Sequence, residues 1–159
     1  MSAYGEFLPD LEAAFQDVAI SALGQAEVVT AQRLDTPPPQ YQGAYLGLVA
    51  LQGALQIGIA SDEAGCQILS KGLMGMTDAD PPLPDGELAD AFCEIVNIVA
   101  GGFKAKVRER SGNLQLGLPV FFRGPAQPTE HTAVKVAVVK MGPVSAALLL
   151  VFPRGNGQG

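Results

Sequence analysis

The chain has 159 residues, of which 48% are hydrophobic, so it is long enough to bury the core of one domain. Sixteen acidic and ten basic residues give it a net charge of −6. This acidity argues against a nucleic-acid partner, because neutralisation of phosphates by basic side chains supplies most of the affinity for nucleic acid.

The sequence pattern favours a cytoplasmic protein. The first ten residues, MSAYGEFLPD, lack a basic region followed by an apolar run, so we expect no signal peptide. The most apolar run, at 143–152, is too short to cross a bilayer, so we expect no membrane insertion. Two cysteines far apart, Cys66 and Cys93, do not make a disulfide framework, which fits a reducing compartment.

The first half of the chain predicts a helix, a strand, a proline-rich loop, a hairpin and a second helix. Asp10 is the expected N-cap of the first helix and Ser61 that of the second. The hairpin is expected to turn near Gln52 and Gly53. The predicted bounds are 8–24 for the first helix, 27–34 for the strand, 45–61 for the hairpin and 61–76 for the second helix.

The second half predicts a similar order. Pro81, Pro82 and Pro84 forbid a helix in the linker that precedes it. A long helix is then expected at 85–110, a short strand near 114–122 and a hairpin at 132–152. We predict that residues 1–153 form a single domain and that 154–159, rich in glycine, are a disordered tail.

A diverged internal duplication explains this repeated order. The interval from Phe15 to Gly24 equals that from Phe92 to Gly101, and each long helix begins near Leu-Pro-Asp. We therefore predict an α+β fold in which two similar halves share a mostly antiparallel sheet. The two long helices are expected to pack together on one face of that sheet.

The long helix of the second half has an apolar and a polar side. At about 100° per residue its polar side carries Asp90, Glu94, Asn97 and Gly101, which cluster within roughly 60°. Such a line is an ordinary feature of amphipathic helices. However, asparagine is an indifferent helix former, and glycine costs helix stability, so both invite a functional explanation. The opposite side carries the predicted core residues Leu88, Phe92, Ile95, Val99 and Phe103.

The spacing of Asp90, Glu94, Asn97 and Pro119 resembles the signature of the CheC/CheX/FliY family of chemotaxis phosphatases. The stretch IVNIVAGGFKAKV resembles the family's asparagine-containing helix, and LMGM at 73–76 resembles the end of its middle helix. The resemblance covers nearly the whole chain. CheC-like members carry the motif on both long helices, whereas here Ile20 stands where Asn97 would repeat. The chain therefore resembles CheX most, which implies one site per chain and a homodimer.

The resemblance implies a hydrolase that dephosphorylates a phosphorylated CheY-like response regulator in chemotaxis or two-component signalling. In that role Asn97 orients the attacking water and Glu94 pairs with the receiver's active-site lysine. Asp90 at the rim and Pro119 near the helix have supporting roles. The family has no cofactor or metal of its own, and the magnesium belongs to the partner receiver domain.

Two other functions stay open at this point. One is a non-catalytic module of the same fold that docks a receiver or a signalling protein, and the other is a sensor of small ligands. Four further features have ordinary structural explanations. They are His131 as a loop residue, Cys93 as a small buried thiol, the basic run 104–110 as a helix C-terminus, and GNGQG as a chance match to a dinucleotide motif.

Overall fold

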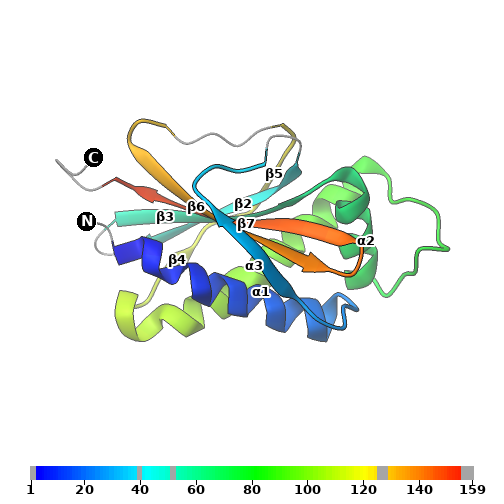
Figure 1. The fold of residues 1–159 in the computed structure, drawn as a ribbon, viewed down its shortest axis with the longest axis horizontal. Helices are drawn as coiled ribbons and strands as arrows, with labels where there is room; N and C mark the ends of the chain where they lie inside the picture. The colour runs from blue at the N-terminus through cyan, green and yellow to red at the C-terminus, as the bar shows by residue number, and fades with distance from the viewer. Residues whose placement is uncertain (1–2, 39–40, 51–52, 125–128, 155–159) are drawn as a thin grey trace.

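In the part of the chain that the structure describes, one antiparallel sheet is the centre of the fold, and three α-helices lie against it (Figure 1). The computed structural model describes residues 3–38, 41–50, 53–124 and 129–154. Its helices are the 3-10 helix η1 (Ala3–Phe7), α1 (Leu8–Ala22), α2 (Glu63–Leu73) and α3 (Asp85–Ser111). Its strands are β1 (Val29–Leu34), β2 (Gln42–Ala50), β3 (Gly53–Ser61), β4 (Gln115–Leu116), β5 (Val120–Phe122), β6 (Thr132–Met141) and β7 (Val144–Pro153).

The two halves of the chain exchange strands within the sheet. The strand order is β1-β6-β7-β3-β2-β4, and β5 also pairs with β2. The hairpin β2–β3 belongs to the first half and β6–β7 to the second, and β3 pairs with β7 at the centre. Strand β1 of the first half pairs with β6, while β4 and β5 of the second half pair with β2. The predicted α+β fold with two halves in one antiparallel sheet is confirmed.

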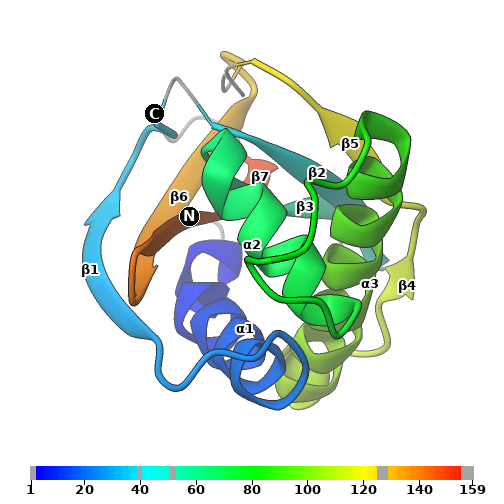
Figure 2. The same cartoon turned by 90° about the vertical axis from the view of Figure 1, so that its right-hand side faces the viewer.

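All three α-helices lie on the same side of the sheet, which curves around them (Figure 2). Phe15 of α1 and Phe92 and Phe103 of α3 are fully buried in the core between helices and sheet. Burying one such side chain contributes about 1.5–3 kcal/mol. The predicted apolar side of the long helix is confirmed, since each of its five members is at most 2% exposed.

The other face of the sheet carries a smaller apolar cluster. Val136 and Leu149 are almost fully buried there, on the neighbouring strands β6 and β7. Tyr45 of β2 stacks on Phe122 of β5, with ring centroids 4.4 Å apart, and packs against this cluster. The far face is therefore closed in part by aromatic side chains from the strands themselves.

Both predicted helix caps are wrong. Helix α1 continues directly from η1, so Phe7 stands at the cap position without a side-chain hydrogen bond, and Asp10 lies in the first turn. Helix α2 is capped by Asp62, whose Oδ1 accepts a 2.7 Å hydrogen bond from Gly65 N. Ser61 instead ends β3, and its hydroxyl donates to the carbonyl of Ser145 at 2.6 Å.

The predicted strand at 114–122 is broken into β4 and β5. Gly117 lies between them, and its N–H donates to the carbonyl of Gly47 at 2.7 Å. A Cβ at Gly117 would lie 3.1 Å from that carbonyl oxygen, so the chain approaches β2 closely here. The predicted turn at Gln52, part of the loop before β6 and residues 155–159 of the tail lie outside the described residues. None of the helices in the described ranges is both long and apolar enough to span a membrane.

Candidate functional site

Helix α3 carries the predicted motif, and the charged residues at its two ends have the signs that the helix dipole favours. Asp85 and Glu87 lie in its first turn, and Arg108 and Arg110 lie in its last turn. Acids at the N-terminus and bases at the C-terminus complement the helix macrodipole. Its 27 residues span about 40 Å along the helix axis.

Side chains from other elements fix both ends of α3. Before its N-terminus, the amide of Gln67 in α2 accepts from Leu83 N at 2.8 Å and donates to Leu83 O at 3.0 Å. Near its C-terminus, Lys106 pairs with Asp17 of α1 at 3.0 Å, and Arg110 pairs with Asp10 at 2.8 Å. The sequence pattern does not predict these anchors, because contacts between distant segments leave no periodic signal.

Asp90, Glu94 and Asn97 point into solvent from α3. All three are exposed, while Phe92 and Ile95 between them are fully buried. Within the described part of the chain, no side-chain hydrogen bond or ion pair involves any of the three. Glu94 and Asn97 are separated by about 4.5 Å along the helix axis. The structure therefore brings the carboxylate and the amide together on one convex surface, with their polar atoms available to a partner.

Pro119 lies apart from this exposed line. It is half-buried and immediately precedes β5, where its lack of an N–H group suits the break before the strand. Two residues later, Phe121 packs edge-on against Phe92 on the buried side of α3, with centroids 6.2 Å apart. Pro119 thus belongs to a segment that contacts the buried side of α3 through Phe121.

Neither cysteine is an activated nucleophile. Burial raises the pKa of Cys93, and the neighbouring carboxylate of Asp90 raises it further. Burial raises the pKa of Cys66 to about 12. The thiolate is the nucleophilic form, and both environments disfavour it at neutral pH.

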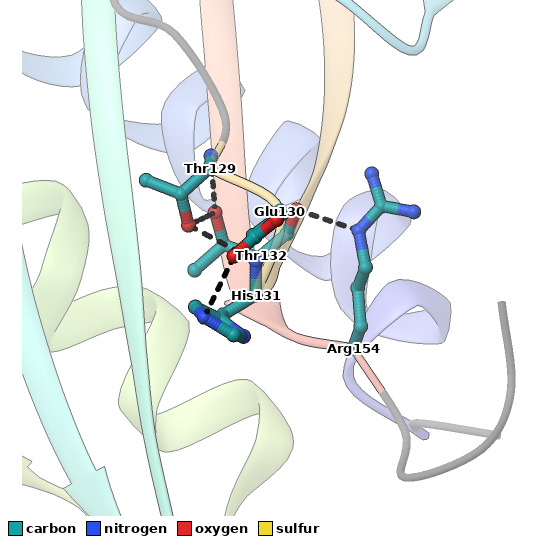
Figure 3. Close-up of polar contacts among 5 residues, drawn as sticks. All are labelled: Thr129, Glu130, His131, Thr132 and Arg154. Carbon is teal, nitrogen blue, oxygen red and sulfur yellow. Dashed lines mark hydrogen bonds and ion pairs between the residues drawn. The ribbon is translucent and has the colours of Figure 1, made fainter.

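His131 belongs to a solvent-exposed turn that leads into β6 (Figure 3). Its ring lies 3.3 Å from the carboxylate of Glu130, and both side chains are 86% exposed. The hydroxyl of Thr132 accepts from Thr129 N at 2.9 Å, and Arg154 Nε donates to Thr132 O at 3.0 Å. These contacts give His131 the structural surroundings of a loop residue.

Because Asp90, Glu94 and Asn97 are exposed on α3, they can act on a group that a partner brings to the helix. Among the described residues, no group of three or more His, Cys, Asp or Glu side chains could hold a metal ion. A shallow depression between η1 and β1 is lined by Glu6, Arg33, Asp35 and Lys135, among others, and contains no motif residue. The exposed line on α3 remains the candidate site.

Comparison with known proteins gives the family. The family model described as "Chemotaxis phosphatase CheX" matches residues 45–141, more than half of the chain. The chain belongs to the CheX family. The matched region contains all four residues of the predicted motif, from Asp90 to Pro119. No curated protein matches the sequence.

Solved structures of CheX and CheC-like proteins share the fold. The CheX protein of Vibrio vulnificus is 19% identical, with a TM-score of 0.74 over 91% of this chain and 97% of that chain. A CheC-like protein from Shewanella is 15% identical, with a TM-score of 0.78 over 97% and 100%. The CheX–CheY–BeF3–Mg2+ complex from Borrelia burgdorferi is 14% identical to this chain, with a TM-score of 0.74 over 94% and 98%.

Proposed function

We propose that this CheX-family protein is a phosphatase that hydrolyses the aspartyl phosphate of a CheY-like response regulator. The observation that carries the proposal is the exposed pair Glu94 and Asn97, one helical turn apart and without partners among the described residues. The family supports it, as does the Borrelia structure, in which a CheX protein is in complex with CheY. Beryllofluoride in that complex is an analogue of a phosphoryl group.

Hydrolysis needs a water in line with the bond that breaks. Water attacks phosphorus, the bond to the aspartate oxygen breaks, and inorganic phosphate and a free carboxylate result. Catalysis of such a step depends mainly on positioning and on stabilisation of charge. The Asn97 amide suits this task, because its carbonyl accepts a hydrogen bond from the water and its NH2 group donates two.

Glu94 serves docking in this mechanism. A carboxylate close to a phosphoryl group repels it unless the carboxylate faces a cation, so Glu94 pairs with the receiver's active-site lysine. Asp90 supports this contact from the rim, one turn earlier. Magnesium belongs to the receiver, since one amide and two carboxylates on a convex helix offer no closed set of six oxygens.

The test is phosphate release from phosphorylated CheY-like receivers mixed with this protein. Asn97→Ala is expected to slow dephosphorylation by about 100-fold or more, because the water loses its orienting group. Receiver affinity is expected to stay within a few fold. Near-normal activity in this variant would contradict the assignment. Normal receiver binding without any acceleration by the wild type would instead favour the non-catalytic docking module.

The assembly is part of the proposal. We propose that residues 1–153 fold as one unit that forms a homodimer in the cytoplasm. The resemblance to CheX supports the dimer, and the exchange of strands between the halves supports the single unit. Light scattering on the purified protein tests the dimer, and a monomer mass at micromolar concentration would contradict it.

A further inference from the structure

Among the residues that the structure describes, nothing packed against Gly101 requires a glycine. It lies in the middle of α3, one turn after Asn97 on the same exposed line. A Cβ at this position would meet no atom of another described element within 4 Å, and the backbone has no positive φ there. Glycine in a helix interior is less stable than alanine. Gly102 differs, because its added Cβ would contact Ala14 of α1 at 3.6 Å.

The basic residues after Gly101 fall into two groups. Lys106 and Arg110 pair with acids of α1. Lys104 and Arg108 form no ion pair within the described ranges, and they lie within roughly 60° of Gly101 around the helix. The macrodipole accounts for bases in the last turn only, and Lys104 lies almost two turns before Ser111, where α3 ends.

We propose that the receiver-binding surface of α3 extends from Asn97 over Gly101 to Lys104 and Arg108, and that an acidic part of the phosphorylated receiver covers it. This inference rests on the proposed function and deepens it. Gly101 is the point where the receiver approaches the backbone of α3. Lys104 and Arg108 are docking residues that lie up to about 16 Å beyond Asn97 along the axis.

The charges along this surface favour an acidic part of the receiver as the partner and determine the direction in which the receiver binds. On the exposed line of α3, Asp90 and Glu94 make the N-terminal end negative, and Lys104 and Arg108 make the C-terminal end positive. The uncharged residues Asn97 and Gly101 lie between them. A receiver that covers this line therefore places its lysine at Glu94 and its acidic residues at Lys104. Complementary charges of this kind orient a partner and raise the rate of association.

The glycine is tested with Gly101→Ala and Gly101→Leu in the full chain. The Tm is expected to be unchanged or higher, while kcat/KM for receiver dephosphorylation falls with side-chain size, by about tenfold or more for leucine. Gly86 supplies the matched control, because it is also exposed on α3 and its added Cβ would also meet nothing within 4 Å. Gly86→Leu is expected to keep wild-type activity. Wild-type kcat/KM in Gly101→Leu would overturn the inference.

The contact of Lys104 and Arg108 with the receiver is tested by measuring receiver affinity. The probe is a receiver that the wild type dephosphorylates, activated with beryllofluoride and magnesium. Lys104→Glu with Arg108→Glu is expected to raise its Kd by about tenfold or more and to reduce the salt dependence of binding. Lys140→Glu, at an exposed lysine near the end of β6, is expected to leave the Kd unchanged. An unchanged Kd in the double variant would contradict the basic contact.

The two proposals fail in different ways. If the wild type accelerates dephosphorylation of no phosphorylated receiver, the proposed function fails, and this inference fails with it. If the wild type is active and Asn97→Ala is not, but the variants at Gly101 and Lys104 bind and react as the wild type does, only the extended surface is wrong.

Discussion

At the residue scale, the exposure of Glu94 separates a docking role from a structural one. Its carboxylate has no hydrogen-bond or ion-pair partner in the described part of the chain, so its removal leaves no buried group unpaired. Glu94→Ala and Glu94→Gln are therefore expected to keep the wild-type Tm. Truncating one partner of a buried interfacial ion pair costs about 2–5 kcal/mol, so receiver affinity should fall by at least about 30-fold.

Glu109→Ala is a suitable control for Glu94, since it removes the same side chain from an exposed position of the same helix. We expect it to bind the receiver as the wild type does. Calorimetric titration of the beryllofluoride-activated receiver measures both variants. Unchanged binding by Glu94→Ala would show that the glutamate does not pair with a receiver lysine.

Cys93 reports on Asp90 independently of the receiver. Its raised pKa lowers the thiolate fraction at pH 8, so alkylation by iodoacetamide should be slower than that of free cysteine and should keep rising above pH 9. Asp90→Asn removes a negative charge that raises this pKa, so it should accelerate alkylation of Cys93. Mass spectrometry of the two cysteine peptides measures it. Glu87→Gln is the control, and equal rates in Asp90→Asn and the wild type would contradict the charge effect.

The raised pKa of Cys66 makes the stability of the folded protein depend on pH. Its folded pKa, raised from 9.0 to about 12, means that the folded state holds the thiol proton more tightly than the unfolded state does. Its contribution to stability is therefore fully present below about pH 9 and is lost as the pH rises toward 12. Alkylation of Cys66 should accordingly require unfolding, because the side chain is fully buried.

At the element scale, the sequence predicted the helices and strands and many of their bounds to within two residues, but not the helix caps or the break in the strand at 114–122. Periodicity over α3 predicted both the buried Phe92 and the exposed Asn97, because a helix of 27 residues repeats its pattern many times. Caps depend on single side chains and on the chain before them, and there the prediction was wrong for Asp10 and Ser61. The break between β4 and β5 depends on the contact of Gly117 with Gly47 of β2, which local sequence does not encode.

The short strand β5 provides a test of Pro119. If Pro119 only positions α3 through Phe121 and Phe92, Pro119→Ala should change dephosphorylation by no more than a few fold. The free energy of unfolding should fall by about 0.4–1 kcal/mol, since the unfolded chain gains freedom. Pro143→Ala, in the exposed turn between β6 and β7, controls for that general effect. A loss approaching that of Asn97→Ala, with stability intact, would indicate contact with the substrate.

At the scale of the whole molecule, the two halves of the chain exchange strands. The repeated order of helices and strands in the sequence did not predict this exchange. Hairpin signals are local, so the sequence predicted β2–β3 and β6–β7 as pairs. The pairing of β1 with β6 and of β5 with β2 joins segments about 100 and 80 residues apart, as the partners Arg33 and Ala137, and Ala44 and Phe121, show. Each half thus completes the sheet of the other, and neither half retains all its strand neighbours alone.

The same two-half arrangement predicts that only α3 carries a site. On α1, Asp17 and Ile20 stand where α3 has Glu94 and Asn97. Ile20 offers no hydrogen bond to a water molecule, although it is 46% exposed. The carboxylate of Asp17, 68% exposed, already pairs with Lys106 of α3 at 3.0 Å. An acid engaged within the chain is less available to a receiver's lysine than the unpaired Glu94.

Asp17→Ala is therefore expected to leave dephosphorylation essentially intact and to lower the free energy of unfolding by only about 0.2–1 kcal/mol, the usual worth of an exposed ion pair. Ile20→Asn should not create a second site, because Asp17 is shorter than a glutamate by one methylene and stays paired with Lys106. Titration with activated receiver should saturate at one receiver per chain in both variants. Loss of most activity in a folded Asp17→Ala protein, or two receivers bound per chain, would overturn the one-site interpretation.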